Sequence, residues 1–437
     1  MSADRYVVLG LAHVRSTWFT EVARWSTSGS VPVEFVKCVS TEELRARMRS
    51  GRPFSAALLD GRLPAVDRDL MAGLQDSGVV PLVVEAGPGG PDWVALGARA
   101  TLALPLERAA LLDALTEHAR LIGAVDQHIA QPGDLPLPPA WLGRLVAVTG
   151  RSGAGTSTIA AALAQTLADD PRNGGDVVLA DLARHAHQAL LHDARDVVPG
   201  IQDLVEANRT GRPSADEVRR LSFDVPARGY RLLLGLRRPS DWITIRSRAF
   251  GAALEGLRSS ARVVVADIDA DLEGEAATGS LDIEDRNLLA RTVVDRADVV
   301  VVVSTPTTTG LHNLILQLAD LRANGVPGDR ILVVVNRAPR GARTRAGLAR
   351  AIANLSGAPT QPDPHVGPVF VTERRNVDHI HRDLARFPGG LADPPGTAVR
   401  AMFERLGPRP TATEPVAVAV GSLGTWHDYD SDEEATS

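Results

Sequence analysis

Lysine and cysteine are nearly absent from this chain of 437 residues: Cys38 is its only cysteine and Lys37 its only lysine. One cysteine excludes a disulfide framework and a four-thiolate metal site, and it fits a reducing compartment. Because 47 residues are basic and only one of them is lysine, the positive charge of the chain is carried by arginine. Any phosphate-binding site after Lys37 must therefore work without lysine.

Long apolar runs and a basic net charge are absent too. The longest apolar run, Val299 to Val303, is far too short to span a bilayer. The first residues, MSADRYVVLG, lack the basic and apolar regions of a signal peptide. We therefore expect a cytoplasmic protein without an integral membrane segment. The formal net charge of -6 offers no general attraction for phosphate backbones, so we expect no nucleic-acid partner.

The apolar pattern predicts two doubly wound α/β domains. In residues 1–127, five short apolar strands alternate with amphipathic stretches. Residues 128–143 are proline-rich and predict a linker. In residues 144–408, seven runs rich in valine and leucine predict parallel strands buried on both faces, followed by a short final helix, AVRAMFERLG. Residues 409–437 are polar and acidic and predict a disordered tail.

The segment Val146 to Thr158, VAVTGRSGAGTST, has the strand, glycine loop and helix that a phosphate-binding loop requires. Its glycines let backbone N–H groups form an anion-binding nest, to which a helix N-terminus adds partial positive charge. A hydroxyl at Ser157 is placed to ligate Mg²⁺. The alternative is a tight turn whose glycines serve packing only. The predicted phosphate cradle comprises Gly150, Ser152, Gly153, Ala154, Gly155, Thr156, Ser157 and Thr158.

The lysine of the standard pattern G-x-x-x-x-G-K-[ST] is missing, because Thr156 stands in its place. A charge-assisted hydrogen bond contributes about 1.5 to 3 kcal/mol, so its loss should weaken nucleotide binding by about 10- to 100-fold. We expect slow hydrolysis, if the chain is an ATPase at all.

The loop resembles the deviant P-loop, K-G-G-x-G-K-[ST], of the MinD/ParA group of dimerising ATPases. Arg151 stands at the early lysine, which in that group reaches the partner's nucleotide, so the resemblance implies a homodimer and a catalytic role for Arg151. It also implies that Asp181 is the catalytic switch I aspartate, although Ala183 replaces a second acid. Asp267, with Asp269 as a second candidate, would hold Mg²⁺ together with Ser157. Asn336 would read the adenine of ATP.

The sequence AALLDGRLP around Asp60 resembles a response-regulator receiver domain in the flavodoxin-like class. The acidic pair and the lysine of receivers are replaced by Gly10, Leu11 and Leu104, so we expect a pseudo-receiver that is not phosphorylated. A pseudo-receiver before a MinD-like domain resembles the TadZ/CpaE proteins of tight-adherence (Flp) pilus assembly, as does the segment PGIQDLVEA, Pro199 to Ala207. Septum-site-determining proteins are similar, and the sequence does not separate the two groups.

Three functions remain open on the sequence. The first is an ATP-dependent spatial switch that recruits a pilus or cell-division machine to a cell pole or septum, and the second is a nucleotide-free scaffold. The third, a ParA-like DNA partitioner, would need a basic surface. The cluster His185, His187 and His192 could indicate a metal site, but we interpret it as a solvated loop face. We expect His379 and His381 to lie on a strand or loop.

Overall fold

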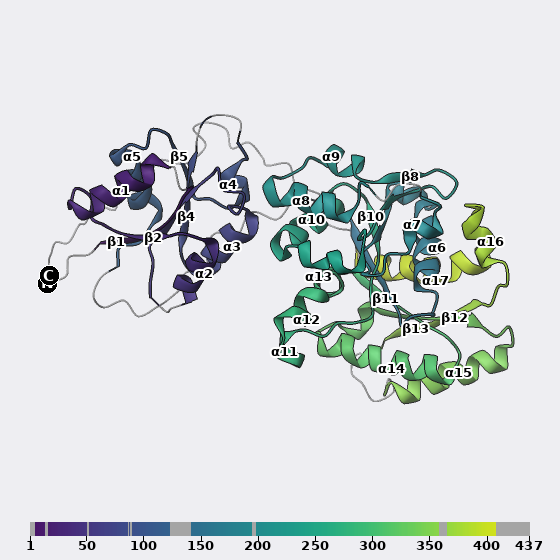
Figure 1. The fold of residues 1–437 in the computed structure, drawn as a ribbon. Coiled ribbons are helices and arrows are strands. Elements are labelled where there is room, and N and C mark those ends of the chain that lie inside the picture. The colour runs from purple at the N-terminus through teal and green to yellow at the C-terminus, as the bar shows by residue number, and fades with distance from the viewer. Residues whose placement is uncertain are drawn as a thin grey trace, which may run out of the picture.

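The computed structural model describes residues 5–13, 16–49, 52–85, 87, 90–122, 141–194, 198–357 and 365–407. Within these ranges the chain forms an N-terminal unit (residues 5–122) and a C-terminal unit (residues 141–407), side by side in Figure 1. Each unit has a largely parallel sheet covered by helices on both faces, which confirms the predicted α/β class. No helix in the described ranges is both long and apolar enough to cross a bilayer.

The N-terminal sheet has five parallel strands in the order β2-β1-β3-β4-β5, which is the order of flavodoxin-like folds. Each strand falls on one of the five predicted apolar runs. The resemblance to receiver domains stays a prediction. The strands are β1 (Tyr6–Leu11), β2 (Val33–Cys38), β3 (Ala56–Asp60), β4 (Val80–Glu85) and β5 (Ala100–Ala103). One face is covered by α1 (Thr17–Thr27) and α5 (Arg108–His118), the other by α2 (Thr41–Arg49), α3 (Arg68–Asp76) and α4 (Trp93–Leu96).

The C-terminal sheet has eight strands in the order β13-β12-β11-β6-β10-β7-β9-β8, and only the pair β8 and β9 is antiparallel. The central strands β10 and β11 are apolar up to their last residue because helices cover both of their faces. The strands are β6 (Arg144–Thr149), β7 (Val177–Asp181), β8 (Phe223–Val225), β9 (Tyr230–Leu233), β10 (Val263–Asp267), β11 (Val299–Ser304), β12 (Ile331–Ala338) and β13 (Val366–Thr372).

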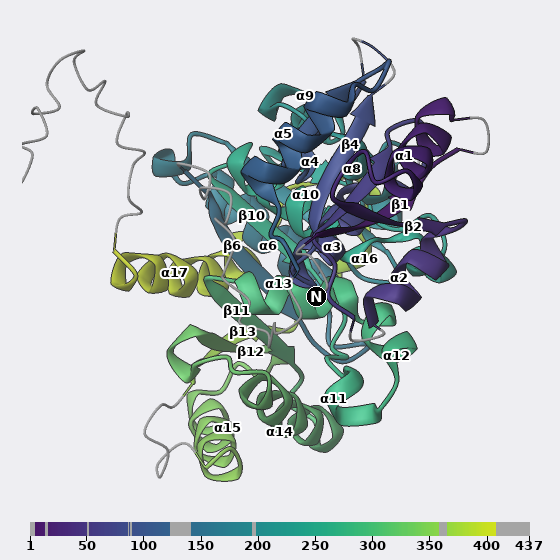
Figure 2. The same ribbon diagram turned by 90° about the vertical axis from the view of Figure 1, so that its left-hand side faces the viewer.

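The helices of the C-terminal unit divide between two apolar cores, one on each face of the sheet. Figures 1 and 2 both place α14 and α15 at the end of this unit that is away from the N-terminal sheet. One face carries α6 (Thr156–Ala168), α16 (Val377–Arg382) and α17 (Gly389–Arg405). The other carries α8 (Ile201–Thr210), α9 (Ala215–Arg220), α10 (Ser247–Ser259), α13 (Leu288–Arg296), α14 (Thr308–Ala323) and α15 (Ala342–Leu355). Short helices α7 (Gln188–Leu191), α11 (Glu275–Thr278) and α12 (Leu281–Arg286) lie in connections.

The two units contact each other through α3 on one side and α8 and α10 on the other. Asp69 accepts hydrogen bonds from the backbone N–H groups of Arg248 (2.9 Å) and Ala249 (3.3 Å) in the first turn of α10. Arg209 pairs with Asp67 at 3.2 Å across the same contact. Arg246 stands at the N-cap position of α10, but its side chain makes no hydrogen bond to the first turn of the helix. The N-terminal unit therefore supplies the cap that α10 lacks.

Several sequence expectations differ from the structure. Strand β8 was not predicted, because three residues are too few to show an apolar pattern. Helix α17 begins at Gly389 rather than at the predicted Ala398 and contains two prolines, whose helix-breaking effect is offset by close packing of α17 on α6. His379 and His381 lie on a helix, α16, rather than on a strand or loop. The predicted linker, apart from residues 141–143, and the predicted tail, residues 409–437, lie outside the described residues.

Candidate functional site

The strand order creates a crevice beside β6. The helix after β6, α6, packs on one face of the sheet, whereas the helix after the neighbouring strand β11, α14, packs on the other. The connections that follow β6 and β11 therefore turn to opposite faces of the sheet. This leaves a cavity between them at the carboxyl ends of the two strands. Ligands of open α/β sheets bind at such a switch point.

The glycine loop lies at this crevice, and each of its three glycines is required for a different reason. A Cβ on Gly150 would come within 2.5 Å of the Val303 carbonyl oxygen, so Gly150 permits close packing against β11. Gly153 has a φ of 83°, in the left-handed region, and a Cβ there would meet nothing within 4 Å. Gly155 has a φ of 88° and is the N-cap of α6. The strand, loop and helix of the predicted cradle are therefore present.

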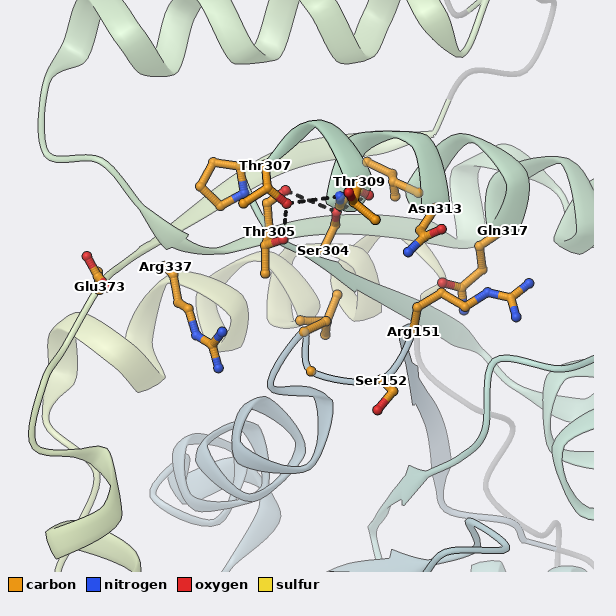
Figure 3. Close-up of a pocket in the computed structure, with 16 residues that line it drawn as sticks. Arg151, Ser152, Ser304, Thr305, Thr307, Thr309, Asn313, Gln317, Arg337 and Glu373 are labelled. Atoms are coloured by element: carbon orange, nitrogen blue, oxygen red, sulfur yellow. Dashed lines mark hydrogen bonds between the residues drawn. The ribbon is translucent and has the colours of Figure 1, made fainter.

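The cavity itself has a volume of about 450 Å³ and opens between the glycine loop and the start of α14. Figure 3 shows the hydroxyl groups of Thr305, Thr307 and Thr309 along one side of it. Helix α14 starts here with Thr307 as its N-cap, so the partial positive charge of a second helix N-terminus faces the cavity. Its other lining residues include Arg151, Ser152, Gly153, Ala154, Asn313, Gln317, Arg337 and Glu373.

Asp181 and Asp267 form a buried carboxylate pair on the other side of the loop. They stand opposite each other in the register of β7 and β10, and their exposed fractions are 0% and 2%. Burial raises the pKa of Asp181 well above its usual range, and the charge of Asp267 raises it further. Burial also raises the pKa of Asp267 to about 6, although hydrogen bonds from Ser157 and Gln188 oppose this shift. Neither residue lines the cavity.

Gln188, which the sequence did not single out, occupies the space between the two carboxylates and the glycine loop. Its Nε2 atom donates to Asp267 Oδ2 at 2.8 Å and to the Ser157 carbonyl oxygen at 3.0 Å. Its backbone N–H donates to Asp181 Oδ2 at 2.8 Å. The side chain of Gln188 therefore joins Asp267 to the start of α6, and its backbone N–H adds Asp181 to the same group.

The position of Gln188 is set by a buried polar network. His192 Nε2 lies 2.6 Å from the Tyr230 hydroxyl and 3.2 Å from Arg228 Nη1, while His192 Nδ1 lies 2.8 Å from the Gln188 carbonyl oxygen. Because a guanidinium can only donate, Nε2 accepts and Nδ1 carries the proton that is donated to Gln188. Burial, and then the Arg228 charge, lower the pKa of His192 to about 4, which keeps this tautomer neutral.

The interpretation of the three histidines as one solvated face is wrong for His192, whose exposed fraction is 6%. His185 and His187 are exposed, as expected. Their exposure and the burial of His192 follow from the short helix α7, which turns the chain inward at Gln188. Across the described residues, no group of three or more histidine, cysteine, aspartate or glutamate side chains could hold a metal ion.

Two further predicted site residues, Asn336 and Thr158, make side-chain hydrogen bonds within the chain, whereas the side chain of Thr156 makes none to any described residue. Asn336 donates from Nδ2 to the Ala154 carbonyl oxygen at 2.8 Å and accepts from the Arg337 N–H at 2.8 Å. The Thr158 hydroxyl lies 3.0 Å from His381 Nε2. The Thr156 hydroxyl is buried with no hydrogen-bond partner among the described residues and lies beside Gly150. Asn336 thus positions the glycine loop, and its role in adenine reading stays a prediction.

Arg151 makes ion pairs within its own chain rather than standing free for a partner. Its guanidinium lies 3.0 Å from Asp271 and 3.9 Å from Asp320. Arg184 holds Asp269 at 3.1 Å and Asp271 at 3.2 Å. Asp269, the second candidate for a metal ligand, is therefore neutralised by arginine, and a contact of Arg151 across a dimer would require its pair with Asp271 to open.

The residues fit a nucleotide's phosphates better than they fit Mg²⁺. Gly153 opens onto free space beside a helix N-terminus, as a phosphate cradle requires. The buried oxygens Asp181 Oδ1 and Gln188 Oε1 have no partner within the described ranges, which suits a positive ligand. However, Asp267 Oδ2 already accepts from Gln188, so a cation at Ser157 and Asp267 requires the Gln188 amide to withdraw.

The structure thus gathers the predicted site residues into two groups. Arg151, Ser152, Gly153 and Ala154 line the cavity, whereas Ser157, Asp181 and Asp267 surround Gln188. The sequence did not point to Gln188, to Arg337 or to the lining threonines Thr305, Thr307 and Thr309, which lie after β11 and at the start of α14. The run STPTTTG after a buried strand was the one signal that could have indicated the threonines, because strand ends carry ligand sites in α/β folds.

No protein-family model matches the chain, and neither does any curated protein sequence. Solved structures that are similar include a ParA family ATPase from Chlorobium tepidum, with 14% identity and a TM-score of 0.47 over 59% of this chain and 98% of that one. The cell division ATPase MinD of Pyrococcus furiosus has 16% identity and a TM-score of 0.43 over 61% of this chain and 100% of that one. An ATP complex of a McdA variant from Cyanothece has 14% identity and a TM-score of 0.43, over 60% and 96%. At these identities and TM-scores the similarities do not establish the activity of this chain.

Proposed function

We propose that this protein is a nucleotide-binding spatial regulator of the MinD/ParA type, which binds ATP at the glycine loop and hydrolyses it slowly or not at all. The nucleotide state would control a homodimer that recruits a pilus-assembly or cell-division machine to a cell pole or septum. The observation that carries the proposal is the switch-point cavity, which is bounded by the glycine loop and by the start of a second helix.

The chain's own residues account for binding and for slow chemistry. The N-termini of α6 and α14 and the backbone of Gly153 supply donors and partial positive charge for phosphate oxygens. Mg²⁺, where bound, would neutralise phosphate charge, with Ser157 and Asp267 as the residues to hold it. Thr156 brings no cation to the loop, and Asp181 is held by the Gln188 N–H. Hydrolysis should therefore be slow.

A nucleotide-free scaffold is the second candidate, because the Gln188 amide already satisfies Asp267 and the Ser157 carbonyl. In that function the Gln188 amide would stay bonded to Asp267 and to the Ser157 carbonyl. The C-terminal unit and the N-terminal unit docked on it would then form one rigid platform for partner proteins. A DNA partitioner has no such supporting observation, given the net charge of -6.

Calorimetric titration of the purified chain with ATP and Mg²⁺ separates these functions. We expect saturable binding that weakens in Asp267→Asn, a variant of the same shape that lacks the carboxylate charge. Asp282→Asn is the matched control, because Asp282 is exposed on α12 and remote from the loop in sequence. If the unaltered protein gives no heat of binding at millimolar ATP, the nucleotide-dependent function is excluded and the nucleotide-free scaffold remains.

A further inference from the structure

We infer that Arg337 replaces the missing lysine of the glycine loop, as the cation that faces the phosphates of the ligand. This inference rests on the proposed function and adds to it the residue that selects for phosphate. It also narrows the ligand class to nucleotides that carry phosphate, as opposed to uncharged nucleosides.

Among the described residues, only two cations line the 450 Å³ cavity, Arg151 and Arg337. Arg151 is engaged with Asp271 at 3.0 Å and with Asp320 at 3.9 Å. The guanidinium of Arg337 bonds to no residue in the described part of the chain, and its side chain is exposed. Figure 3 shows the two arginines on opposite sides of the glycine loop, with the guanidinium of Arg151 pointing away from Arg337. Arg337 is therefore the available positive charge of the cavity.

The backbone of Arg337 is tied to the glycine loop by two hydrogen bonds in series. Its N–H donates to Asn336 Oδ1 at 2.8 Å, and Asn336 Nδ2 donates to the Ala154 carbonyl oxygen at 2.8 Å. The register between β12 and β13 is also irregular between Val335 and Ala338, which lets the chain turn at this point. The arginine is thus held next to the loop by its own neighbour.

Arg337 has a φ of 53°, in the left-handed region that non-glycine residues seldom adopt. Such a conformation costs about 1 to 3 kcal/mol and persists where the surrounding structure requires it, often at ligand sites. A glycine at this position would remove the strain, so packing and folding give no reason for an arginine. Binding of an anion in the cavity does give one.

Arginine suits this role because its fork of N–H groups binds two oxygens of one phosphate at once. Thr156, at the lysine position, turns its short side chain toward Gly150 and brings no charge to the cavity. The chain has no lysine after Lys37 that could reach the loop from elsewhere. A cation that enters from the end of β12 would therefore compensate for the one lost from α6.

Titration of the full chain with ATP, ADP and adenosine tests this role of Arg337. We expect Arg337→Ala to weaken ATP and ADP binding by about 10- to 100-fold and to leave adenosine binding unchanged, because only phosphates meet the guanidinium. Arg337→Gly should show the same loss with a fold at least as stable, since the backbone conformation suits glycine. Arg340→Ala, which removes an exposed arginine that does not line the cavity, should bind like the unaltered protein.

The double variant Thr156→Lys, Arg337→Ala is the decisive one, because a lysine returned to the loop should restore most of the lost affinity. Equal losses for adenosine and ATP, or no loss at all in Arg337→Ala, would overturn the inference while the proposed function stands. Absence of rescue by Thr156→Lys would show that the two positions do not serve the same phosphate and would also overturn it. If the unaltered protein binds no nucleotide, the proposed function fails and the inference fails with it.

Discussion

Asp181 and Asp267 place two carboxyl groups opposite each other on adjacent strands with almost no exposure to water. Desolvation favours the neutral form of each acid, and the charge of Asp267 further favours the neutral form of Asp181. Burial therefore raises the pKa of both residues, that of Asp267 to about 6. The pair reduces the stability of the protein at neutral pH in the absence of a positive ligand.

We expect Asp181→Asn to make the stability of the protein less dependent on pH. Because burial raises the pKa of Asp181 above its value in the unfolded chain, stability is retained at pH values below about 4 and is lost as the pH rises toward the folded-state pKa. Asparagine cannot ionise, so Asp181→Asn should be more stable than the unaltered protein at pH 8, and the difference should be smaller at pH 5. Hydrogen exchange of the β7 and β10 amides at the two pH values measures the difference.

Asp282→Asn, at an exposed position, is the control for the loss of one negative charge from the chain and should leave the exchange rates unchanged. An Asp181→Asn variant that is equally or less stable at pH 8 would contradict the raised pKa values.

At the scale of elements, α7 is a helix of one turn whose position depends on side chains. Four residues are too few to form a stable helix alone. His192 donates from Nδ1 to the Gln188 carbonyl and accepts at Nε2 from the Tyr230 hydroxyl, and these two bonds hold α7 against the sheet. This placement, rather than any helical preference of the sequence, brings the Gln188 amide to Asp267.

If Gln188 competes with Mg²⁺ for Asp267, Gln188→Ala should lower the Mg²⁺ concentration needed for half-maximal ATP binding. Loss of one hydrogen bond to a carboxylate corresponds to about 1.5 kcal/mol, or roughly a tenfold lower concentration. Titration of Mg²⁺ at a fixed ATP concentration measures this shift. Gln75→Ala, at an exposed glutamine of α3, is the matched control, and an unchanged midpoint in Gln188→Ala would show that the amide does not compete.

At the scale of the whole molecule, Asp69 joins the two units because its carboxylate caps α10. Loss of an N-cap costs about 1 kcal/mol. We therefore expect Asp69→Ala to increase the exchange rates of the Arg248 and Ala249 amides by about fivefold. Hydrogen exchange of the full chain measures both amides.

Asp92→Ala is the control for this prediction, because Asp92 caps α4 within the N-terminal unit by accepting from the Ala95 N–H. It should change the exchange of α4 and leave α10 unaffected. Unchanged protection of Arg248 in Asp69→Ala would show that the cap contributes nothing to docking.

Much of the fold could be predicted because its signals are local. Runs such as the five valines of β11 are continuously apolar, which is typical of a parallel strand covered on both faces. The glycine loop was predictable for the same reason, since strand, glycines and helix follow one another in the chain. Strand β8 and the true start of α17 were not, because a short edge strand and a helix that contains prolines are stabilised by their neighbours.

Local patterns in the amino-acid sequence were enough to predict the class of the fold and the position of the glycine loop, and they show that the loop has no lysine. Which side chains meet at the loop depends on tertiary contacts, because the hydrogen bonds that place Gln188 and Asn336 join segments far apart in the chain. The hydrogen bond from Arg248 in α10 to Asp69 also joins segments far apart in the chain. Local patterns report which backbone a segment prefers, whereas charge, burial and hydrogen bonding at a site depend on neighbours that come together only when the chain has folded.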